Sequence, residues 1–357
     1  MCIRDSGYPM ISILQEPEHR IHKNNIPDLS HVAVPLWKAQ KMYAVGYRFV
    51  GRHSAIKICE WTRESIRGKN VCYKCKFYGI HSNQCIQMSP AVQFCDFNCK
   101  HCWRSLSYTL PPEQFEWDGP KFILDGCIEA QRQILQGFKG SESADQQKVI
   151  EAMMPQHVAI SLSGEPTLYP RLPEFVDEIM SRDMTAYLVT NGTHPEMIQR
   201  LVDHQPTNLY MTLPAPDKEH YVKECAPMIS NGWEKIMQTM SLFRQFTCRT
   251  LVRLTLNRKH NLFAPEKYAE MLEAAQPSVI ECKSYMAVGG ARKKLGPEFM
   301  VTHEDIRSFA QVIENNAPSY KIMNEKADSR VVMLQRKDLN LRAEEVMSDD
   351  AFKMDVS

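Results

Sequence analysis

The sequence has no apolar run that approaches the ~20 residues of a membrane-spanning helix. Its N-terminus also lacks the basic stretch followed by an apolar stretch that is typical of a secretory signal peptide. Net charge is almost absent as well, because 43 basic side chains balance 42 acidic ones across 357 residues. With a mean hydropathy of −0.39, these absences argue against a membrane or secreted protein and predict a globular chain in the cytoplasm.

Cysteine, in contrast, is plentiful and unevenly distributed. Seven of the 12 cysteines lie between Cys59 and Cys102, and the other five are scattered along the chain. Disulfide frameworks belong mostly to short secreted chains that cannot build a large core, whereas this chain is long and carries 20 Met and 14 Phe. We therefore expect reduced thiols with a metal or iron–sulfur role in an intracellular compartment.

Positive charge is concentrated in one part of the nearly neutral chain. Residues 51–81 contain seven Lys or Arg and only two acidic residues, Glu60 and Glu64, which gives a local net charge of +5. A charged stretch of this kind is typical of a solvated face, and it can also form a surface for a polyanion. The composition alone leaves both interpretations open.

From about residue 90 the chain repeats a unit of short apolar run, polar turn and amphipathic segment. The expected strands are the apolar runs at residues 91–95, 157–164, 185–192, 208–215, 248–256 and 278–285. The expected helices lie at residues 122–138, 172–183, 233–246, 265–276 and 303–316. Strands that alternate with helices predict parallel βαβ units, in either an open sheet or a barrel. Both architectures bind ligands at the carboxyl ends of the strands, so functional residues should follow the apolar runs.

Composition and pattern divide the chain into five parts. These are a flexible leader (1–35), a basic N-terminal segment (36–90), the β/α region (91–300), a C-terminal helix with a strand pair (301–337) and an acidic tail (338–357). The leader shows no sustained period and the tail has little apolar content, so both are expected to be mobile. Thr193 and Thr302 stand at expected helix starts, and the strand pair is expected around Tyr320 and residues 330–335.

The first apolar run ends in a cysteine motif. Cys95, Cys99 and Cys102 have the spacing C-x3-C-x2-C on a segment that leads from a strand towards a helix. Three thiolates this close together can bind a four-iron cluster and leave one iron open for a small molecule. Structural zinc normally requires four protein ligands, and although His101 could serve as the fourth, its position beside Cys102 disfavours this. A cluster with three cysteine ligands is the favoured interpretation.

This motif after a first strand resembles that of the radical S-adenosylmethionine (SAM) superfamily, whose fold is a partial (β/α)6 barrel. The resemblance implies an α/β, TIM-like partial barrel with an N-terminal cluster-binding extension and a small C-terminal addition. It also implies a SAM-binding [4Fe–4S] cluster on the three cysteines. The positions that match SAM-contacting segments of the superfamily are His101, Ser163, Gly164, Glu165, Thr190 and Asn191.

The upstream cysteines narrow the resemblance. Cys59, Cys72 and Cys85 are 13 residues apart from one to the next, and Cys85 precedes Cys95 by 10. With this spacing and the segments SGEPTLYP, TNGTHPEM and MAVGGARKKL, residues 36–336 resemble the archaeal-type tRNA 4-demethylwyosine synthase family of wybutosine biosynthesis. The family implies a second, auxiliary [4Fe–4S] cluster on these three cysteines. It also implies pyruvate held as a Schiff base by the lysine that matches Lys74.

The reaction of this family joins pyruvate to N1-methylguanosine at position 37 of tRNA(Phe) and gives 4-demethylwyosine. Cleavage of SAM supplies a radical that removes hydrogen from the N1-methyl group, and the resulting carbon radical attacks the pyruvate carbonyl. No flavodoxin-like region precedes the barrel, so the resemblance implies a separate electron donor of the ferredoxin or flavodoxin type. We expect a cytoplasmic monomer that contacts no membrane.

Two other functions stay open. A radical SAM enzyme could act on a different substrate and use the second cluster for electron transfer. A zinc-stabilised RNA-binding protein without redox chemistry would carry a similar basic, cysteine-rich stretch. The iron, sulfide and zinc content of the protein separates the last possibility from the first two.

A tRNA substrate accounts for the basic stretch, because clustered Lys and Arg supply salt-sensitive affinity for phosphates. The candidate tRNA contacts are Arg63, Arg67, Lys69, Lys76, Arg292, Lys293 and Lys294. A base displaced from the anticodon loop is commonly held against aromatic side chains. The aromatic residues near the cysteines are Tyr73, Phe77, Tyr78 and Trp103, and a core position is the favoured interpretation for each.

Two features depart from the pattern of the family. Cys75 is one residue beyond Lys74 and is not among the expected ligands, so it is either a spectator or a competitor of Cys72 for iron. The segment LTLNRKHN at residues 254–261 lacks the glycine expected before Asn261, which leaves the SAM contacts of this strand end unassigned. The scattered cysteines within apolar stretches are expected to be small buried residues; they are Cys127, Cys225, Cys248 and Cys282.

Overall fold

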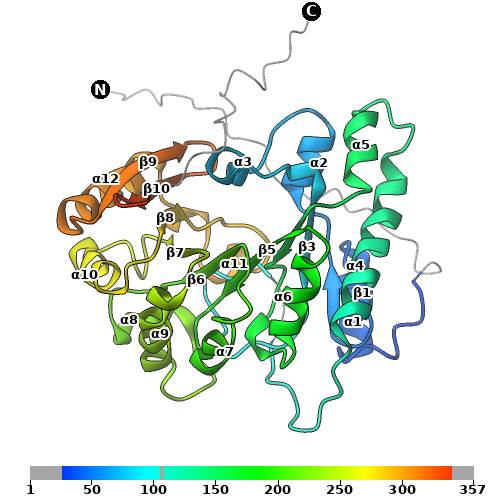
Figure 1. Cartoon of the computed structure of the whole chain (residues 1–357), viewed down its shortest axis with the longest axis horizontal. Coiled ribbons are helices and arrows are strands. Elements are labelled where there is room, and N and C mark those ends of the chain that lie inside the picture. Colours follow the sequence, from blue (N-terminus) through cyan, green and yellow to red (C-terminus); the bar gives the residue numbers. More distant parts are fainter. Residues whose placement is uncertain (1–25, 105–107, 340–357) are drawn as a thin grey trace, which may run out of the picture.

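The computed structural model describes residues 26–104 and 108–339, which form one ten-stranded sheet with helices around it (Figure 1). The strands lie in the order β1-β2-β3-β4-β5-β6-β7-β8-β10-β9. Their bounds are β1 Arg48–Val50, β2 Ser54–Ile56, β3 Cys85–Ser89, β4 His157–Ile160, β5 Thr185–Thr190, β6 Asn208–Thr212, β7 Arg249–Leu256, β8 Val279–Ser284, β9 Tyr320–Lys326 and β10 Val331–Arg336. Strands β3 to β8 are parallel, and antiparallel strands extend both edges. The sheet is thus the partial barrel that was expected.

Helices connect the parallel strands, because a parallel pair needs a crossover rather than a tight turn. Their bounds are α1 Leu36–Ala44, α2 Glu60–Ile66, α3 Tyr73–Tyr78, α4 Pro120–Leu135, α5 Gln146–Ala152, α6 Leu172–Met180, α7 Pro195–Arg200, α8 Lys218–Cys225, α9 Gly232–Ser241, α10 Pro265–Ala275, α11 Gly289–Lys294 and α12 His303–Asn316. Within the described residues, none of the helices is long and apolar enough to cross a bilayer.

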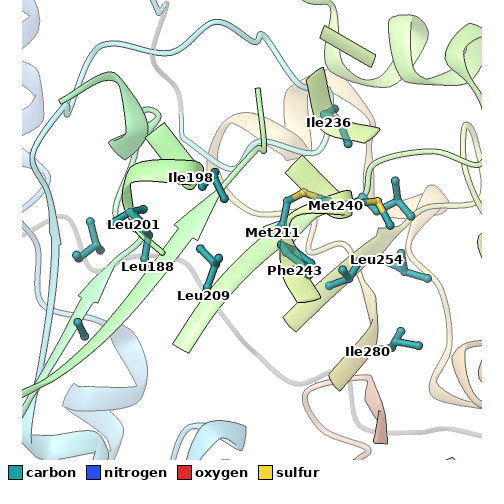
Figure 2. Packing of buried hydrophobic residues seen from close by; sticks show 14 of the residues in the cluster. Leu188, Ile198, Leu201, Leu209, Met211, Ile236, Met240, Phe243, Leu254 and Ile280 are labelled. Carbon is teal, nitrogen blue, oxygen red and sulfur yellow. The ribbon is translucent and has the colours of Figure 1, made fainter. Parts of the chain in front are cut away.

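The outer face of the sheet packs against the crossover helices. Figure 2 shows buried side chains of β5, β6, β7 and β8, such as Leu188, Leu209 and Leu254, beside Ile198 of α7 and Ile236 of α9. Strand residues two apart share a face, so the intervening residues point to the other side. Burial on both faces explains why these strands are continuous apolar runs.

The inner face of the sheet is covered by the N-terminal segment rather than by a crossover helix. Tyr187 of β5 and Tyr210 of β6 pack in one cluster with Tyr73, Phe77 and Tyr78 of α3. In Figure 1, α3 lies beside the strands β8, β9 and β10, far from α3 in sequence. The helix α3, which belongs to the basic, cysteine-rich stretch, therefore lies in the barrel interior.

Five of the six expected parallel strands lie within the predicted runs, but the first was wrong. Residues 91–95 form a buried loop, in which Val92 N donates to His53 O (3.0 Å) and Phe94 makes an isolated bridge with Thr109. The first parallel strand is β3, which begins at Cys85. A short, fully buried loop is as apolar as a strand, so the composition of residues 91–95 does not distinguish a loop from a strand.

The helix-start expectations had different outcomes. Thr302 is the N-cap of α12, where its side chain accepts from Asp305 N as expected. The prediction for Thr193 was wrong, because His194 occupies the N-cap position of α7 and the Thr193 hydroxyl donates to the carboxylate of Asp96. The expected C-terminal strand pair is confirmed as β9 and β10.

Packing begins before Leu36, inside the segment expected to be a flexible leader. Leu29, Val32 and Val34 are buried in one cluster with Ala39 and Met42 of α1. The expectations for residues 1–25, including Cys2, and for the tail from residue 340 lie outside the described residues.

The loop after β4 approaches the loop after β3 so closely that only glycine fits. Gly164 has φ +71°, and a Cβ built there would lie 1.9 Å from Ala91 O and 2.6 Å from Phe94 O. Both of these atoms belong to the backbone, so neither can rotate away. Gly68 offers a matched comparison, since it has φ +66° but no atom within 4 Å of its virtual Cβ.

We expect Gly164→Ala to lower the free energy of unfolding by about 2–6 kcal/mol, because backbone strain and steric crowding each cost about 1–3 kcal/mol. Gly68→Ala should lose only about 1–2 kcal/mol, the cost of the left-handed conformation alone. Equilibrium urea unfolding of the two variants measures the difference. Equal losses would contradict the close approach of the two loops.

Candidate active site

The C-x3-C-x2-C loop lies at the carboxyl end of β3 and is bound to the loop after β4. Ser163 Oγ donates to Val92 O (2.7 Å), and Glu165 N donates to Phe94 O (2.7 Å). The SAM-site candidates Ser163, Gly164 and Glu165 are therefore in direct contact with the segment that leads into Cys95.

The three cysteines of this loop are partly buried and share neighbours. Cys102 Sγ lies 3.6 Å from the hydroxyl of Tyr108. Burial raises the pKa of Tyr108, and nearby Cys102 and Cys95 raise it further, so this hydroxyl lies among the cysteine side chains. The pKa of Cys99 is raised by its hydrogen bond with Cys225 and by burial. Cys225 was expected to be a buried bystander; it is buried, and it also contacts an expected cluster ligand.

Glu165 joins two strand ends through its carboxylate. Oε1 accepts from Thr167 N (3.1 Å), Thr167 Oγ1 (2.6 Å) and Thr190 Oγ1 (2.7 Å), and Oε2 accepts from Asn191 N (2.7 Å). Burial nevertheless raises the pKa of Glu165. The structure thus brings the candidates Glu165, Thr190 and Asn191 together, and it uses the acid to fix the loops after β4 and β5.

Asp96 extends this network and was missed by sequence reasoning. Its Oδ1 accepts from Asn191 Nδ2 (2.6 Å), and its Oδ2 lies 3.2 Å from His194 Nε2. Burial would raise the pKa of Asp96, but the nearby His194 ring and the hydrogen bond from Thr193 outweigh burial and hold the pKa below its ordinary value. The sequence feature that could have indicated a site role for Asp96 is its position directly after Cys95, in the loop that follows a strand.

His101 is bound by Glu224, a second carboxylate that the sequence did not reveal. Glu224 Oε1 lies 2.6 Å from His101 Nδ1 and also accepts from His101 N (3.1 Å). Glu224 Oε2 accepts from Asn257 Nδ2 (3.1 Å), which links α8 to the end of β7. With Nδ1 engaged by this acid, only Nε2 of His101 faces other partners.

The unusual end of β7 has a structural explanation. Asn261 Nδ2 donates to Pro214 O (2.8 Å) and Thr255 O (2.9 Å), and its Oδ1 accepts from Asn257 N (2.7 Å). All polar atoms of this side chain have partners within the chain. Asn261 therefore stabilises the loop after β7. Asn257 connects this strand end to His101, because both residues bond to Glu224.

The upstream cysteines converge near the amino ends of the strands. Cys59 and Cys72 are the N-cap residues of α2 and α3, and Cys85 begins β3. Burial raises the pKa of the Cys72 and Cys85 thiols to about 12, and Cys59 acts electrostatically on both, which groups the three side chains. Cys75 Sγ lies 2.9 Å from Ser82 Oγ, the atom that also accepts from Cys72 N (2.9 Å).

Lys74 projects from α3 towards the inner face of the sheet. Its Nζ lies 4.5 Å from the ring centroid of Tyr210 and 4.9 Å from that of Tyr187. Burial lowers the pKa of Lys74, and the positive charge of Arg253 lowers it further, while Cys72 and Glu281 oppose them. The expected Schiff-base lysine thus lies beside the upstream cysteines and over two tyrosine rings.

Glu281 of β8 is a fully buried acid at the centre of the inner face. It accepts from the hydroxyls of Tyr73 (3.1 Å) and Tyr78 (2.5 Å), which flank Lys74 on α3. Arg253 of β7 donates to it through Nε (2.9 Å) and Nη2 (2.8 Å). The sequence analysis did not single out Arg253 or Glu281. Each is a charged residue within an apolar run, and the two runs form adjacent strands, so a pair of opposite charges could have been expected.

Two sets of three thiols match the donor chemistry of four-iron clusters, which cysteine thiolates bind. Among the described residues, no group of three or more His, Cys, Asp or Glu side chains is arranged to hold a single metal ion. The candidate ligands are Cys95, Cys99 and Cys102 in one set and Cys59, Cys72 and Cys85 in the other. Each set leaves one iron of such a cluster without a protein ligand.

The basic candidates fall into two groups. In the first, Arg63 of α2 lies 3.9 Å from Glu60, and Arg67, the C-cap residue of α2, lies 3.8 Å from Glu64. Lys69 is exposed. Lys76 of α3 is half-buried and belongs to the same group. Partial pairing with acids reduces the positive charge that this group offers.

The second basic group is α11, which lies on the SAM-site loop. Gly290 N donates to Trp103 O (2.7 Å), and Lys294 Nζ donates to Cys99 O (3.0 Å). Arg292 and Lys293 are exposed beside it. This helix therefore presents positive charge next to the cysteine loop.

The aromatic candidates divide in the same way. Tyr73, Phe77 and Tyr78 are buried, as expected of core residues. Trp103 is 41% exposed, so the expectation of a core position was wrong for this residue. The guanidinium of Arg104 stacks on its ring at 3.3 Å from the centroid and holds it at the surface beside Cys102.

Comparison with known families agrees with this geometry. The radical SAM superfamily profile matches residues 90–272, and a profile described as wyosine base formation matches residues 274–336. The first region contains the C-x3-C-x2-C loop and the strand ends of β4 and β5. The upstream cysteines lie before both matches.

Relatives that match most of the chain, and a solved structure, indicate the same family. The chain is 45% identical to the SAM-dependent tRNA 4-demethylwyosine synthase of Pyrococcus abyssi, over 82% of this chain and 87% of the relative. It is 36% identical to the Methanocaldococcus jannaschii protein of the same name, over 79% and 91%. A TYW1 structure with a lysine–pyruvate adduct superposes with a TM-score of 0.78 at 34% identity, over 86% of this chain and 97% of that one. The chain belongs to the radical SAM family of S-adenosyl-L-methionine-dependent tRNA 4-demethylwyosine synthases.

Proposed function

We propose that this enzyme condenses pyruvate with N1-methylguanosine at position 37 of tRNA(Phe) to form 4-demethylwyosine. The observation that carries the proposal is the placement of two thiol triads at opposite ends of β3. Cys85 begins this strand, and Cys95 follows its end by six residues. Four residue steps of about 3.3 Å separate the strand ends by about 13 Å. Two cysteine sites, one reached from each end of this strand, suit a reaction that joins two substrates.

In this proposal Cys95, Cys99 and Cys102 hold the cluster that binds SAM, and Cys59, Cys72 and Cys85 hold an auxiliary cluster. When bound, the first cluster and SAM supply the radical chemistry, for which a separate donor of the ferredoxin or flavodoxin type provides electrons. The chain contributes orientation, through the loops fixed by Glu165 and Asp96. We also infer a monomeric enzyme that acts in the cytoplasm.

Lys74 is the proposed attachment point for pyruvate. Its neutral amine would add to the C2 carbonyl, and loss of one water would give the imine. Among the described residues, Lys74 Nζ has neither a hydrogen bond nor an ion pair, and it lies over Tyr187 and Tyr210. The related structure with a lysine–pyruvate adduct supports the same role.

The direct test is anaerobic reconstitution with iron, sulfide, SAM, a reductant, pyruvate and tRNA(Phe) that carries N1-methylguanosine-37. We expect 4-demethylwyosine in the digested tRNA, detected by mass spectrometry. The matched control is the same tRNA without the N1-methyl group, which offers no methyl hydrogen and should remain unmodified. Turnover of the unmethylated tRNA would indicate a different radical SAM reaction.

Metal analysis tests the two clusters separately. Two four-iron clusters predict about eight iron and eight sulfide per chain after anaerobic reconstitution. Replacing Cys59, Cys72 and Cys85 by Ala should halve both numbers, and so should replacing Cys95, Cys99 and Cys102. Zinc without sulfide in the wild-type protein would support an RNA-binding protein instead.

The second basic group provides a test of tRNA binding. We expect Arg292→Glu with Lys293→Glu to weaken tRNA binding and to flatten the dependence of log K on log salt by about one to two units, since each lost phosphate contact removes about 0.7–0.9. Lys294 is left unchanged because it donates to Cys99 O. Filter binding from 50 to 300 mM salt, roughly the range in which phosphate contacts are screened, measures the slope.

A control with matched charge replaces two exposed lysines of α8, Lys218 and Lys223, by Glu. These lysines pair with Glu234 and Glu219 on the outer side of the barrel. If both double variants change the salt slope equally, the effect comes from net charge and the assignment to α11 is wrong.

A further inference from the structure

We infer that the guanidinium of Arg253 binds the carboxylate of the 2-oxo acid held by Lys74 and thereby selects acids over neutral carbonyl compounds. The inference rests on the proposed role of Lys74. It assigns the substrate-selecting group to β7, on the inner face of the sheet, rather than to the cysteine-rich segment itself.

Lys74 and Arg253 flank the same ring. Lys74 Nζ lies 4.5 Å from the centroid of the Tyr210 ring, and Arg253 Cζ lies 4.9 Å from it. The carboxylate carbon of an imine-linked 2-oxo acid lies only about 2.5 Å from the lysine nitrogen, as two covalent bonds separate them. The acid group of such an adduct therefore has to lie close to Tyr210, where Arg253 is the strong donor.

Among the described residues, Arg253 has one guanidinium nitrogen, Nη1, that is available to an anion. Its Nε and Nη2 both donate to Glu281 Oε2, at 2.9 and 2.8 Å, and Nη2 also contacts the Tyr73 hydroxyl (2.5 Å). Among the described residues, no acceptor bonds to its Nη1. An arginine that is anchored through Nε and Nη2 presents the N–H groups of Nη1 in a fixed direction, which suits an oxygen of a carboxylate because the donor is already oriented.

Arg253 shares this part of the inner face with a second base, Lys283, whose Nζ donates to Ser329 O (2.6 Å). A buried cation is stabilised by an anionic partner, because it has lost its hydration. The carboxylate of a 2-oxo acid is such a partner, whereas an aldehyde or an ester carries no negative charge.

The test is reductive trapping on the anaerobically reconstituted enzyme, without tRNA and without turnover. Borohydride converts the imine to a stable amine, and intact-protein and peptide mass spectrometry measure the adduct on Lys74 against the concentration of pyruvate or of methyl pyruvate. We expect Arg253→Gln to raise the half-saturating pyruvate concentration roughly ten- to a hundredfold, as for the loss of a charged hydrogen bond. Trapping of methyl pyruvate should be unchanged.

Because Arg253→Gln leaves Glu281 without its cation, the double variant Arg253→Gln, Glu281→Gln serves as a second test in which both charges are removed together. It should show the same selective loss for pyruvate. Arg249→Gln is the matched control: Arg249 lies four residues earlier on the same face of β7 and stacks on Tyr78 at 5.1 Å, but it is not bonded to Glu281. Its half-saturating pyruvate concentration should stay near that of the wild type.

The outcomes separate the inference from the proposed function. Unchanged pyruvate trapping in both Arg253 variants would overturn the inference, and so would equal losses with pyruvate and methyl pyruvate, which indicate a displaced Lys74. A wild-type enzyme that forms no adduct, or an adduct that persists in Lys74→Ala, would refute the proposed role of Lys74 and the inference with it.

Discussion

The carboxylate of Glu281 is the interaction on which the barrel interior depends. It lies at the middle of β8, fully buried, and it binds Arg253 of β7 and the tyrosines at both ends of α3. A buried carboxylate is stable only if its oxygens accept hydrogen bonds, and here the Arg253 guanidinium and the tyrosine hydroxyls donate them. The same bonds hold α3 on the inner face. Lys74 owes its position above Tyr187 and Tyr210 to this arrangement.

The second constraint is the length of β3. One end of this strand carries Cys85 of the upstream triad, and the other end leads to Cys95 of the radical SAM loop. Because a strand cannot be shortened or stretched appreciably, the two cysteine sets are held at a set separation. The N-terminal segment thus serves two purposes: it covers the inner face of the partial barrel, and it places a second group of thiols at the amino end of β3.

The sequence predicted the repetitive parts of this architecture, and it failed where burial is not periodic. Helix α12 and strands β9 and β10 carry a regular apolar pattern and were located correctly. Residues 91–95 are apolar because they form a buried loop, and no local pattern distinguishes that from a strand. Glu224 gave no signal, since a helical glutamate is ordinarily solvated and its partner His101 is 123 residues away. Arg253 and Glu281 did give one, as opposite charges within two neighbouring apolar strands.

Three buried acids, Asp96, Glu165 and Glu224, hold together the loops around the C-x3-C-x2-C segment. All three acids are buried: Asp96 and Glu165 both accept from Asn191 after β5, and Glu224 accepts from Asn257 after β7. Their oxygens are used within the chain, so their contribution is to lock the loops after β3, β4, β5 and β7 together. A site of this kind loses little conformational entropy on binding, because the loops are ordered by the protein itself.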